Sequence, residues 1–243
     1  MSNYSNPNPL SPRMSFQWVF FQQYRPNVLN IGCADDPLGF GEDAHHYDID
    51  DWSYLHKRFT QGDAAQLPFG DQSWQCIILG DILEHVVDPV KVMSEACRVC
   101  APAGMVVATI FEEWRLPGPG QYIEEGQLRA DKVSQDLGYA GRIDYQDKNY
   151  PDKVTFDDVV TPHLIHINQF TDEIIQTLAD KIAGWGFEPL HLYKAFEVQH
   201  EGHNIYNWLL AFRRLDSGLG GEHLRRIDVP ALFDISSGWI GLR

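Results

Sequence analysis

The chain has 243 residues, of which 44% are hydrophobic, and it includes seven Trp and thirteen Phe. This size and content are typical of one globular α/β domain and exclude a largely disordered chain. The formal net charge is −15 at pH 7, and the longest basic run is an Arg pair. We therefore expect no nucleic-acid partner, because phosphate binding needs clustered Lys and Arg.

The first residues do not resemble a targeting segment. Residues 1–12 are rich in Asn, Pro and Ser and lack the charged-then-apolar pattern of a signal peptide. No apolar stretch of the sequence is long enough to cross a bilayer. We therefore expect a soluble protein with a cytoplasmic location and no membrane partner.

Strand and helix patterns alternate along most of the chain. Helices are expected at residues 14–24, 89–99 and 171–183, where Thr171 is a good N-cap. Pro102 and Gly104 are expected to end the second helix before a strand begins at Met105. Strands are expected at residues 27–31, 45–49, 58–60, 76–79, 105–110, 187–196 and 205–213. This order predicts an α/β domain with a mostly parallel sheet and helices on both faces.

Two segments break this alternation. Residues 111–165 are rich in Gly, Pro, Tyr and Asp, and a stretch of this length inside a domain is usually a lid or an insertion. We expect it to cover an acceptor pocket, with a dimer-forming arm as the alternative. Residues 216–243 are too apolar to remain exposed to solvent, so we expect this tail to dock on the domain or on a second subunit. Residues 1–243 are thus predicted to form one domain.

A glycine turn follows the first expected strand. A dinucleotide site would continue from Gly32 as G-x-G-x-x-G, whereas this chain has Ala34 and then Asp35 and Asp36. Two adjacent carboxylates would repel a pyrophosphate but are tolerable beside a positively charged ligand without phosphate. S-adenosylmethionine is such a ligand. Asp48, which closes the next strand, has the place of a ribose-binding acid.

Four stretches in order resemble the motifs of class I S-adenosylmethionine-dependent methyltransferases of type 11. They are the glycine loop at 29–34, the G-D-A-x-x-L-P-F stretch at 62–69, the L-E-H segment at 83–86 and the R-V-x-x-P-x-G stretch at 98–104. Residues 166–170 and 184–187 resemble the closing elements of that family. The resemblance implies a Rossmann-like sheet of seven strands in which the last strand is antiparallel.

The resemblance also implies a set of cofactor-binding residues. Asp48 would accept the ribose hydroxyls, with Asp50 as the alternative, Asp63 would accept the adenine amino group, and the Gly80 carbonyl would accept the methionine ammonium. The family has Asp where this chain has Asn30, so Asp35 or Asp36 would have to supply the charge. The full predicted set is Asn30, Gly32, Cys33, Ala34, Asp48, Ile49, Asp63, Ala64 and Gly80.

The implied reaction is methylation of a small-molecule acceptor, at oxygen or nitrogen, on a sugar-linked or secondary metabolite. An acceptor that must lose a proton needs a base, and His85 is the first candidate and His166 the second. A structural role for His85, as a helix cap, is the alternative. A non-catalytic module that binds the cofactor or its product is the competing function. A dinucleotide-dependent oxidoreductase is disfavoured by the two adjacent aspartates.

Cysteine and histidine pairs invite a metal interpretation that we do not adopt. Cys97 and Cys100 lie in a helical pattern that predicts a buried position on one helix face, where free Cys packs as a small hydrophobe. The pairs 163/166 and 200/203 are His-x-x-His without a third ligand at fixed spacing. We therefore predict no metal site.

Overall fold

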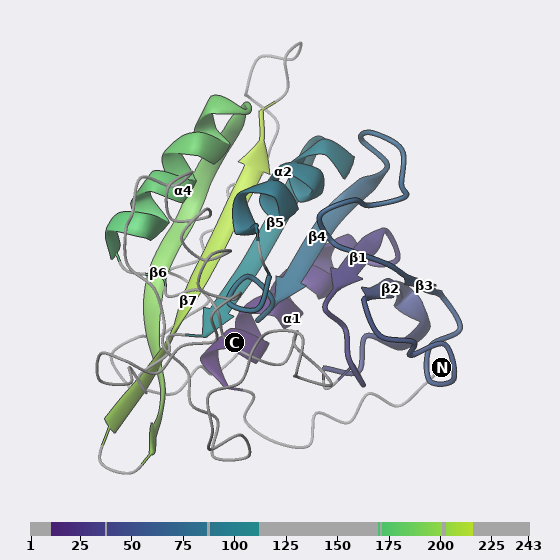
Figure 1. Ribbon diagram of the computed structural model, residues 1–243, viewed down its shortest axis with the longest axis horizontal. Coiled ribbons are helices and arrows are strands. Elements are labelled where there is room, and N and C mark those ends of the chain that lie inside the picture. Colours follow the sequence, from purple (N-terminus) through teal and green to yellow (C-terminus); the bar gives the residue numbers. More distant parts are fainter. Residues whose placement is uncertain are drawn as a thin grey trace, which may run out of the picture.

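The computed structural model describes residues 11–36, 38–86, 88–111, 170, 172–200 and 203–215. The expected insertion, its His166 and the expected tail all lie outside these residues. The described part forms a seven-stranded sheet with the strand order β3-β2-β1-β4-β5-β7-β6 (Figure 1). The strands are β1 (Val28–Ile31), β2 (Ala44–Asp48), β3 (Phe59–Gln61), β4 (Trp74–Gly80), β5 (Cys100–Phe111), β6 (Phe187–His200) and β7 (His203–Arg214).

The pairing of the strands confirms the expected sheet. β1, β2, β3, β4 and β5 pair in parallel, and β7 pairs antiparallel with both β5 and β6. The order reverses between β1, which continues to β2 on one side, and β4 on its other side. In open α/β sheets, ligands bind beyond the carboxyl ends of the strands at such a reversal. This edge of the sheet is therefore where a site is expected.

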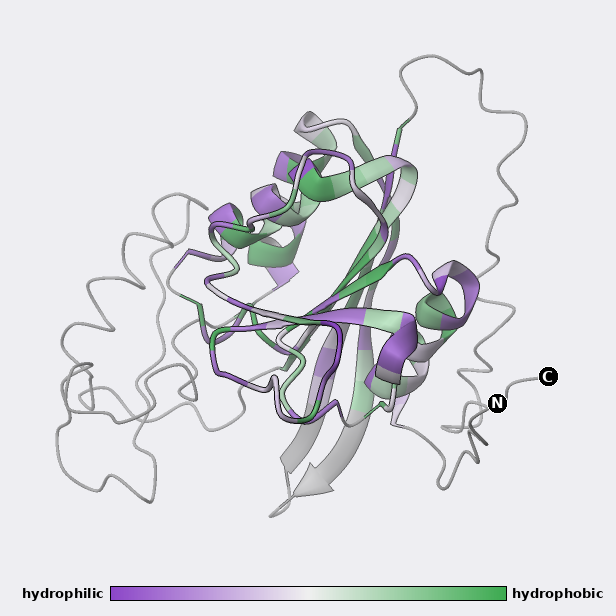
Figure 2. Cartoon of the chain, turned by 90° about the vertical axis from the view of Figure 1, so that its right-hand side faces the viewer, coloured by the Kyte–Doolittle hydropathy of each residue, from purple (hydrophilic) through white to green (hydrophobic). Residues whose placement is uncertain are grey.

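Helices cover both faces of the sheet, as predicted. α2 (Pro89–Val99) and α4 (Asp172–Gly184) pack on the side chains of Leu29, Ile77 and Val106, while α1 (Pro12–Tyr24) packs on the alternate residues of the same strands. Figure 2 shows hydrophobic residues concentrated in the strands and on the helix sides that face them. Because successive strand residues point to opposite faces, one run of apolar residues supplies both cores.

Loops take the place of helices between the first three strands. The described residues of the β1–β2 connection contain only the short 3-10 helix η1 (Gly41–Asp43), and residues 49–58 contain no helix. Phe40 fills part of the space on the α1 face. Its ring is fully buried and stacks on Phe21 with 4.2 Å between the ring centroids. The glycine loop after β1 therefore leads into a packed loop and not into a helix N-terminus.

The predicted bounds of the last three strands need correction. β5 begins at Cys100 and not at Met105, because the chain continues to pair with β4 through Trp74 and Cys100. Pro102 is tolerated there because β7 pairs with β5 only from Met105 onward. The last two strands are also longer than expected, to His200 in β6 and from His203 in β7. Within the described residues, no helix has the length and apolar character to span a membrane.

Candidate functional site

A cavity of about 760 Å³ opens at the carboxyl ends of β1, β2 and β4. All nine predicted cofactor residues line it, although they come from four separate parts of the sequence. His85 also lines it, whereas Asp35 does not. Other residues that line the cavity include Arg13, Gln17, Asp36, Asp50, Trp52, Asp81, Ile82, Asp88 and Lys91.

Gly32 allows the loop after β1 to pack closely against Ile82. Its φ is +72°, and a Cβ there would lie 1.9 Å from Cγ2 of Ile82. Its N–H donates to the carbonyl of Tyr47 at 2.9 Å, which ties the loop to β2. Ala34 has φ +43°, so the position of the second family glycine keeps a left-handed backbone in spite of its Cβ.

The Asp48 carboxylate joins the ends of β1 and β2. One oxygen accepts the N–H of Ala34 at 2.9 Å and the other accepts the N–H of Asp50 at 3.1 Å. Each carboxylate oxygen has further acceptor capacity, so two ligand hydroxyls could still donate to it. Asp50 lines the same cavity, so the alternative acid is also within reach of a ligand.

Asp63 is placed by the turn that follows β3. Its side chain accepts the N–H of Ala65 at 2.8 Å, and its carbonyl accepts the hydroxyl of Tyr47 at 3.0 Å. Gly62 makes room for that hydroxyl, because a Cβ there would lie 2.2 Å from it. Burial raises the pKa of Tyr47 to about 12, so its hydroxyl stays a donor.

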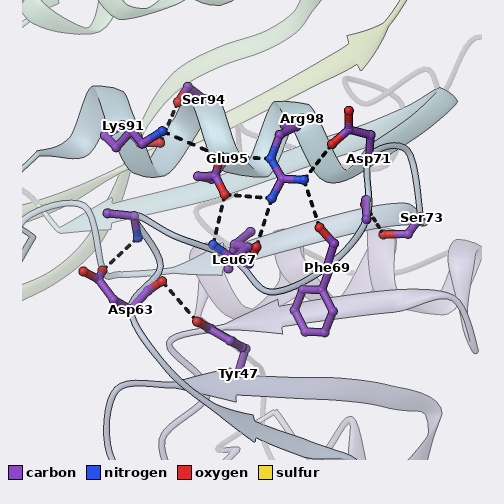
Figure 3. Close-up of polar contacts among 12 residues, drawn as sticks. Tyr47, Asp63, Leu67, Phe69, Asp71, Ser73, Lys91, Ser94, Glu95 and Arg98 are labelled. Atoms are coloured by element: carbon purple, nitrogen blue, oxygen red, sulfur yellow. Dashed lines mark hydrogen bonds and ion pairs between the residues drawn. The ribbon is translucent and has the colours of Figure 1, made fainter.

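An ion-pair network fastens the loop that carries Asp63 (Figure 3). Arg98, in the last turn of α2, donates to Glu95 at 2.8 and 2.9 Å, to Asp71 at 2.7 Å and to the carbonyls of Leu67 and Phe69 at 3.0 and 2.9 Å. Glu95 in turn accepts the N–H of Leu67 at 3.0 Å. The hydrogen bond from Arg98 is the main reason why the pKa of Glu95 is lowered. The R-V and L-P-F motif stretches are therefore physically joined.

A second polar network lies where β4 ends. Asp81, at φ +52°, accepts the hydroxyl of Thr109 at 2.7 Å and forms an ion pair with Arg13 from α1. Thr109 also accepts the side-chain amide of Gln17 at 2.6 Å. The sequence analysis missed this network. Asp81 could have been noticed as an acid directly after a strand, whereas nothing in the pattern of α1 singles out Arg13.

Asn30 and the glycine loop are held by a pair of stacked histidines. The rings of His46 and His56 lie 4.1 Å apart at 13°. His46 contacts the Asn30 amide at 3.4 Å and the Gly41 carbonyl at 2.8 Å, and His56 contacts the Ala34 carbonyl at 2.8 Å. Burial is the largest cause that lowers the pKa of His46. His46 therefore supports the loop as a neutral ring.

The same histidines and Cys33 bring three possible metal-ligand atoms within 4.8 Å of one another. Their geometry fits packing better than metal binding. An imidazole nitrogen binds a metal in the plane of its ring, and two parallel stacked rings cannot both point at one ion. Both nitrogens of His46 are already engaged in hydrogen-bond contacts.

The other cysteine and histidine predictions have separate outcomes. Cys97 and Cys100 are buried free thiols in the core between the sheet and α2, as expected, although Cys100 begins β5 and is not part of the helix. Burial raises the pKa of Cys100 to about 12. The residues 163 and 166 lie outside the described part, as do the side chains of 200 and 203.

The charge of the cavity favours a cation. Six lining side chains are carboxylates, those of Asp36, Asp48, Asp50, Asp63, Asp81 and Asp88, against the two basic side chains of Arg13 and Lys91. No helix among the described residues begins at the glycine loop, so the usual dipole and N–H groups that bind phosphate are missing there. The residues therefore fit a positively charged nucleoside that carries no phosphate.

Comparisons with known proteins agree with this geometry. Residues 41–108 match the family model described as a methyltransferase domain. A segment of 70 residues is 34% identical to a ubiquinone/menaquinone biosynthesis C-methyltransferase of Legionella pneumophila and covers 29% of this chain and 28% of that relative. The chain thus spans less than a third of the length of that curated relative.

Solved structures show the same fold. A methyltransferase from Methanosarcina mazei, described as S-adenosylmethionine-dependent, has a TM-score of 0.56 at 16% identity, over 86% of this chain and all of that one. An N-methyltransferase of Burkholderia thailandensis, solved with 1,6-didemethyltoxoflavin and S-adenosylhomocysteine, has a TM-score of 0.52 at 14% identity, over 85% and 80%. The seven-stranded fold of this chain is therefore similar to that of these two methyltransferases, and residues 41–108 match the methyltransferase domain model.

Proposed function

We propose that this class I methyltransferase domain transfers a methyl group from S-adenosylmethionine to a small-molecule acceptor. One observation carries the proposal. Nine predicted residues from four separate parts of the sequence line one cavity at the strand-order reversal. The family match covers only residues 41–108, so the activity of the whole chain is inferred from this cavity and its charge.

The residues of the cavity suit the parts of the cofactor. Asp48 would accept the two ribose hydroxyls and Asp63 the adenine amino group, while the N–H of Ala64 would donate to a ring nitrogen. The Gly80 carbonyl would accept the ammonium group. When bound, S-adenosylmethionine supplies an electrophilic methyl group on a sulfonium whose leaving group is a neutral thioether.

The protein's main contribution to the reaction would be positioning. Holding an acceptor in line can contribute several kcal/mol to the lowering of the barrier. His85 lines the cavity and is our candidate for removing a proton from a hydroxyl or ammonium acceptor. His166 is the second candidate. We propose oxygen or nitrogen as the accepting atom. The Legionella relative is named a C-methyltransferase, so carbon is the alternative outcome.

Calorimetry with S-adenosylhomocysteine, S-adenosylmethionine and NAD⁺ tests the ligand class. We expect micromolar binding of the first two and none of NAD⁺, and binding of NAD⁺ alone would overturn the proposal. The reaction itself is tested by transfer of a labelled methyl group into a metabolite extract, followed by mass spectrometry of the labelled product. The NMR chemical shift of the methyl group in that product then tells whether oxygen, nitrogen or carbon was methylated.

One observation favours a second candidate function. Asn30 has no charge, and its amide contacts His46 at 3.4 Å. A module that holds the cofactor or its product without catalysis would tolerate this loss. Tight binding of S-adenosylhomocysteine without methylation of any fraction of the extract would favour that module over the enzyme.

A further inference from the structure

We propose that Asp81 and Arg13 form the subsite for the zwitterionic amino-acid end of the cofactor. Asp81 would take the charge role that Asn30 cannot fill. This inference rests on the proposed function and adds to it a pair of binding residues outside the predicted set. An α-amino acid carries an ammonium and a carboxylate side by side, and a carboxylate paired with a guanidinium is its electrostatic complement.

Asp81 is held in a fixed orientation by hydrogen bonds to Thr109. Its N–H donates to the carbonyl of Thr109 at 3.0 Å, and one of its carboxylate oxygens accepts the Thr109 hydroxyl at 2.7 Å. Thr109 is fully buried and is in turn fixed by Gln17, which is also buried. The backbone of Asp81 is left-handed, with φ +52°, a conformation that a non-glycine residue keeps only where its surroundings impose it.

Arg13 approaches Asp81 from a different element. It lies in the first turn of α1, which begins after the N-cap Ser11, and its guanidinium pairs with the second carboxylate oxygen of Asp81. The side chains of Arg13 and Asp81 are 33% and 22% exposed, and both line the cavity. The Arg13–Asp81 ion pair is therefore partly exposed and borders the cavity.

The other acids near the glycine loop are placed less well for this role. One oxygen of Asp36 accepts the N–H of Gly41 at 2.9 Å and lies 4.0 Å from the ring of His46, while the other is buried without a hydrogen-bond partner among the described residues. The Asp36 side chain is only 6% exposed, against 22% for Asp81, so less of it is open to a ligand. Asp35 is exposed and does not line the cavity. Asp81 directly follows Gly80, the residue whose carbonyl is proposed to accept the same ammonium group.

The test compares two ligands that differ only in the amino-acid end. S-adenosylhomocysteine has it, and 5′-methylthioadenosine lacks it. We expect Asp81→Asn and Arg13→Gln each to weaken S-adenosylhomocysteine about 10- to 100-fold by calorimetry, the range for losing a charged hydrogen-bond partner. Binding of 5′-methylthioadenosine should change less than about 3-fold, because its contacts are those of the nucleoside alone.

Two further variants make the result specific. Thr109→Val keeps the shape of the side chain but removes the hydroxyl that positions Asp81, and we expect an intermediate, selective loss for S-adenosylhomocysteine. Asp43→Asn is the control, because it removes an exposed ion pair with Arg25 and neither residue lines the cavity. It should change the affinity for neither S-adenosylhomocysteine nor 5′-methylthioadenosine. Thermal melting checks that every variant is folded.

The outcomes separate the two proposals. An equal loss of both ligands in Asp81→Asn and Arg13→Gln would assign the pair a structural role and overturn the inference, as would unchanged binding of S-adenosylhomocysteine in the two folded variants. If the unaltered protein binds neither nucleoside, the proposed function itself fails, and this subsite fails with it. Selective loss for the ligand with the amino-acid end supports both.

Discussion

The carboxylate of Asp48 accepts the backbone N–H of Ala34 at 2.9 Å and so links the end of β2 to the loop after β1. Its other oxygen accepts the N–H of Asp50. A single side chain thus both shapes the loop and presents its remaining acceptor capacity to the cavity. This double role sets the expected behaviour of substitutions here.

Asp48→Asn should weaken binding of S-adenosylhomocysteine by about 1.4–2.7 kcal/mol, or roughly 10- to 100-fold, because a charged acceptor of two hydroxyls is lost. Asp50→Asn is the matched variant, and we expect less than about 3-fold from it. Calorimetry at one salt concentration measures both. The opposite ranking would move the ribose-binding role to Asp50, and a loss of stability in Asp48→Asn would report its structural role separately.

Gly32→Ala should destabilise the domain by about 2–4 kcal/mol, since it combines an unfavourable φ with a clash. The new Cβ would lie 1.9 Å from Ile82. Gly39→Ala is a control with the same backbone conformation, φ +68°, and open space around the Cβ, so it should cost only about 1 kcal/mol. Urea unfolding of the two variants measures the difference.

The steric part of that effect can be isolated. Adding Ile82→Ala to Gly32→Ala removes the methyl group that the new Cβ would meet. The pair should therefore show a favourable coupling free energy of about 1 kcal/mol or more in a double-mutant cycle. Additive effects of the two changes would mean that the loop moves away from Ile82 and that the close approach is not enforced.

The sequence predicted local structure and motif positions well. α2 runs from Pro89 to Val99 as expected, because Asp88 caps it and the apolar spacing is regular. The predicted cofactor residues meet in one cavity because parallel strands bring their carboxyl ends to one edge. The Arg13–Asp81 pair was beyond reach, since it joins residues 68 positions apart and depends on how α1 docks on the sheet.

The loop regions could not be read from periodicity. His46 lies on β2 and His56 in the loop that follows it, and neither residue has a local sequence pattern that predicts their stacking. The start of β5 was wrong because Pro and Gly usually break an element. Pro102 and Gly104 instead lie inside β5, in the part that comes before its pairing with β7 at Met105.

Arg98→Lys should destabilise the domain by about 2–3 kcal/mol in spite of the retained charge, because an ammonium cannot replace a planar guanidinium that serves two carboxylates and two carbonyls. The loop that carries Asp63 is fastened by this network, so binding of S-adenosylhomocysteine should weaken as well. Arg25→Lys at an exposed ion pair is the control and should stay within about 0.5 kcal/mol. Equal effects of the two variants would show that the Arg98 network adds nothing specific.

His191 should make the protein sensitive to mild acid. It lies on β6 with its ring 5.1 Å from that of Phe16, and burial lowers its pKa from 6.5 to about 4. The unfolded chain therefore binds this proton near pH 6.5 whereas the folded chain does not, so the free energy of unfolding falls as the pH drops from about 6.5 towards 4. Allowing for solvent screening of a partly exposed ring, we expect a loss of about 1–2 kcal/mol between pH 7 and pH 5.

His191→Phe provides the comparison, because it keeps a ring against Phe16 and cannot titrate. Nε2 of His191 has no hydrogen-bond partner among the described residues, so the change removes no described bond at that atom. Urea unfolding at pH 7 and pH 5 should give a smaller pH dependence in the variant. A residual dependence is expected from His46, whose pKa burial also lowers. The same pH slope in both proteins would show that the proton taken up on acid unfolding does not belong to His191.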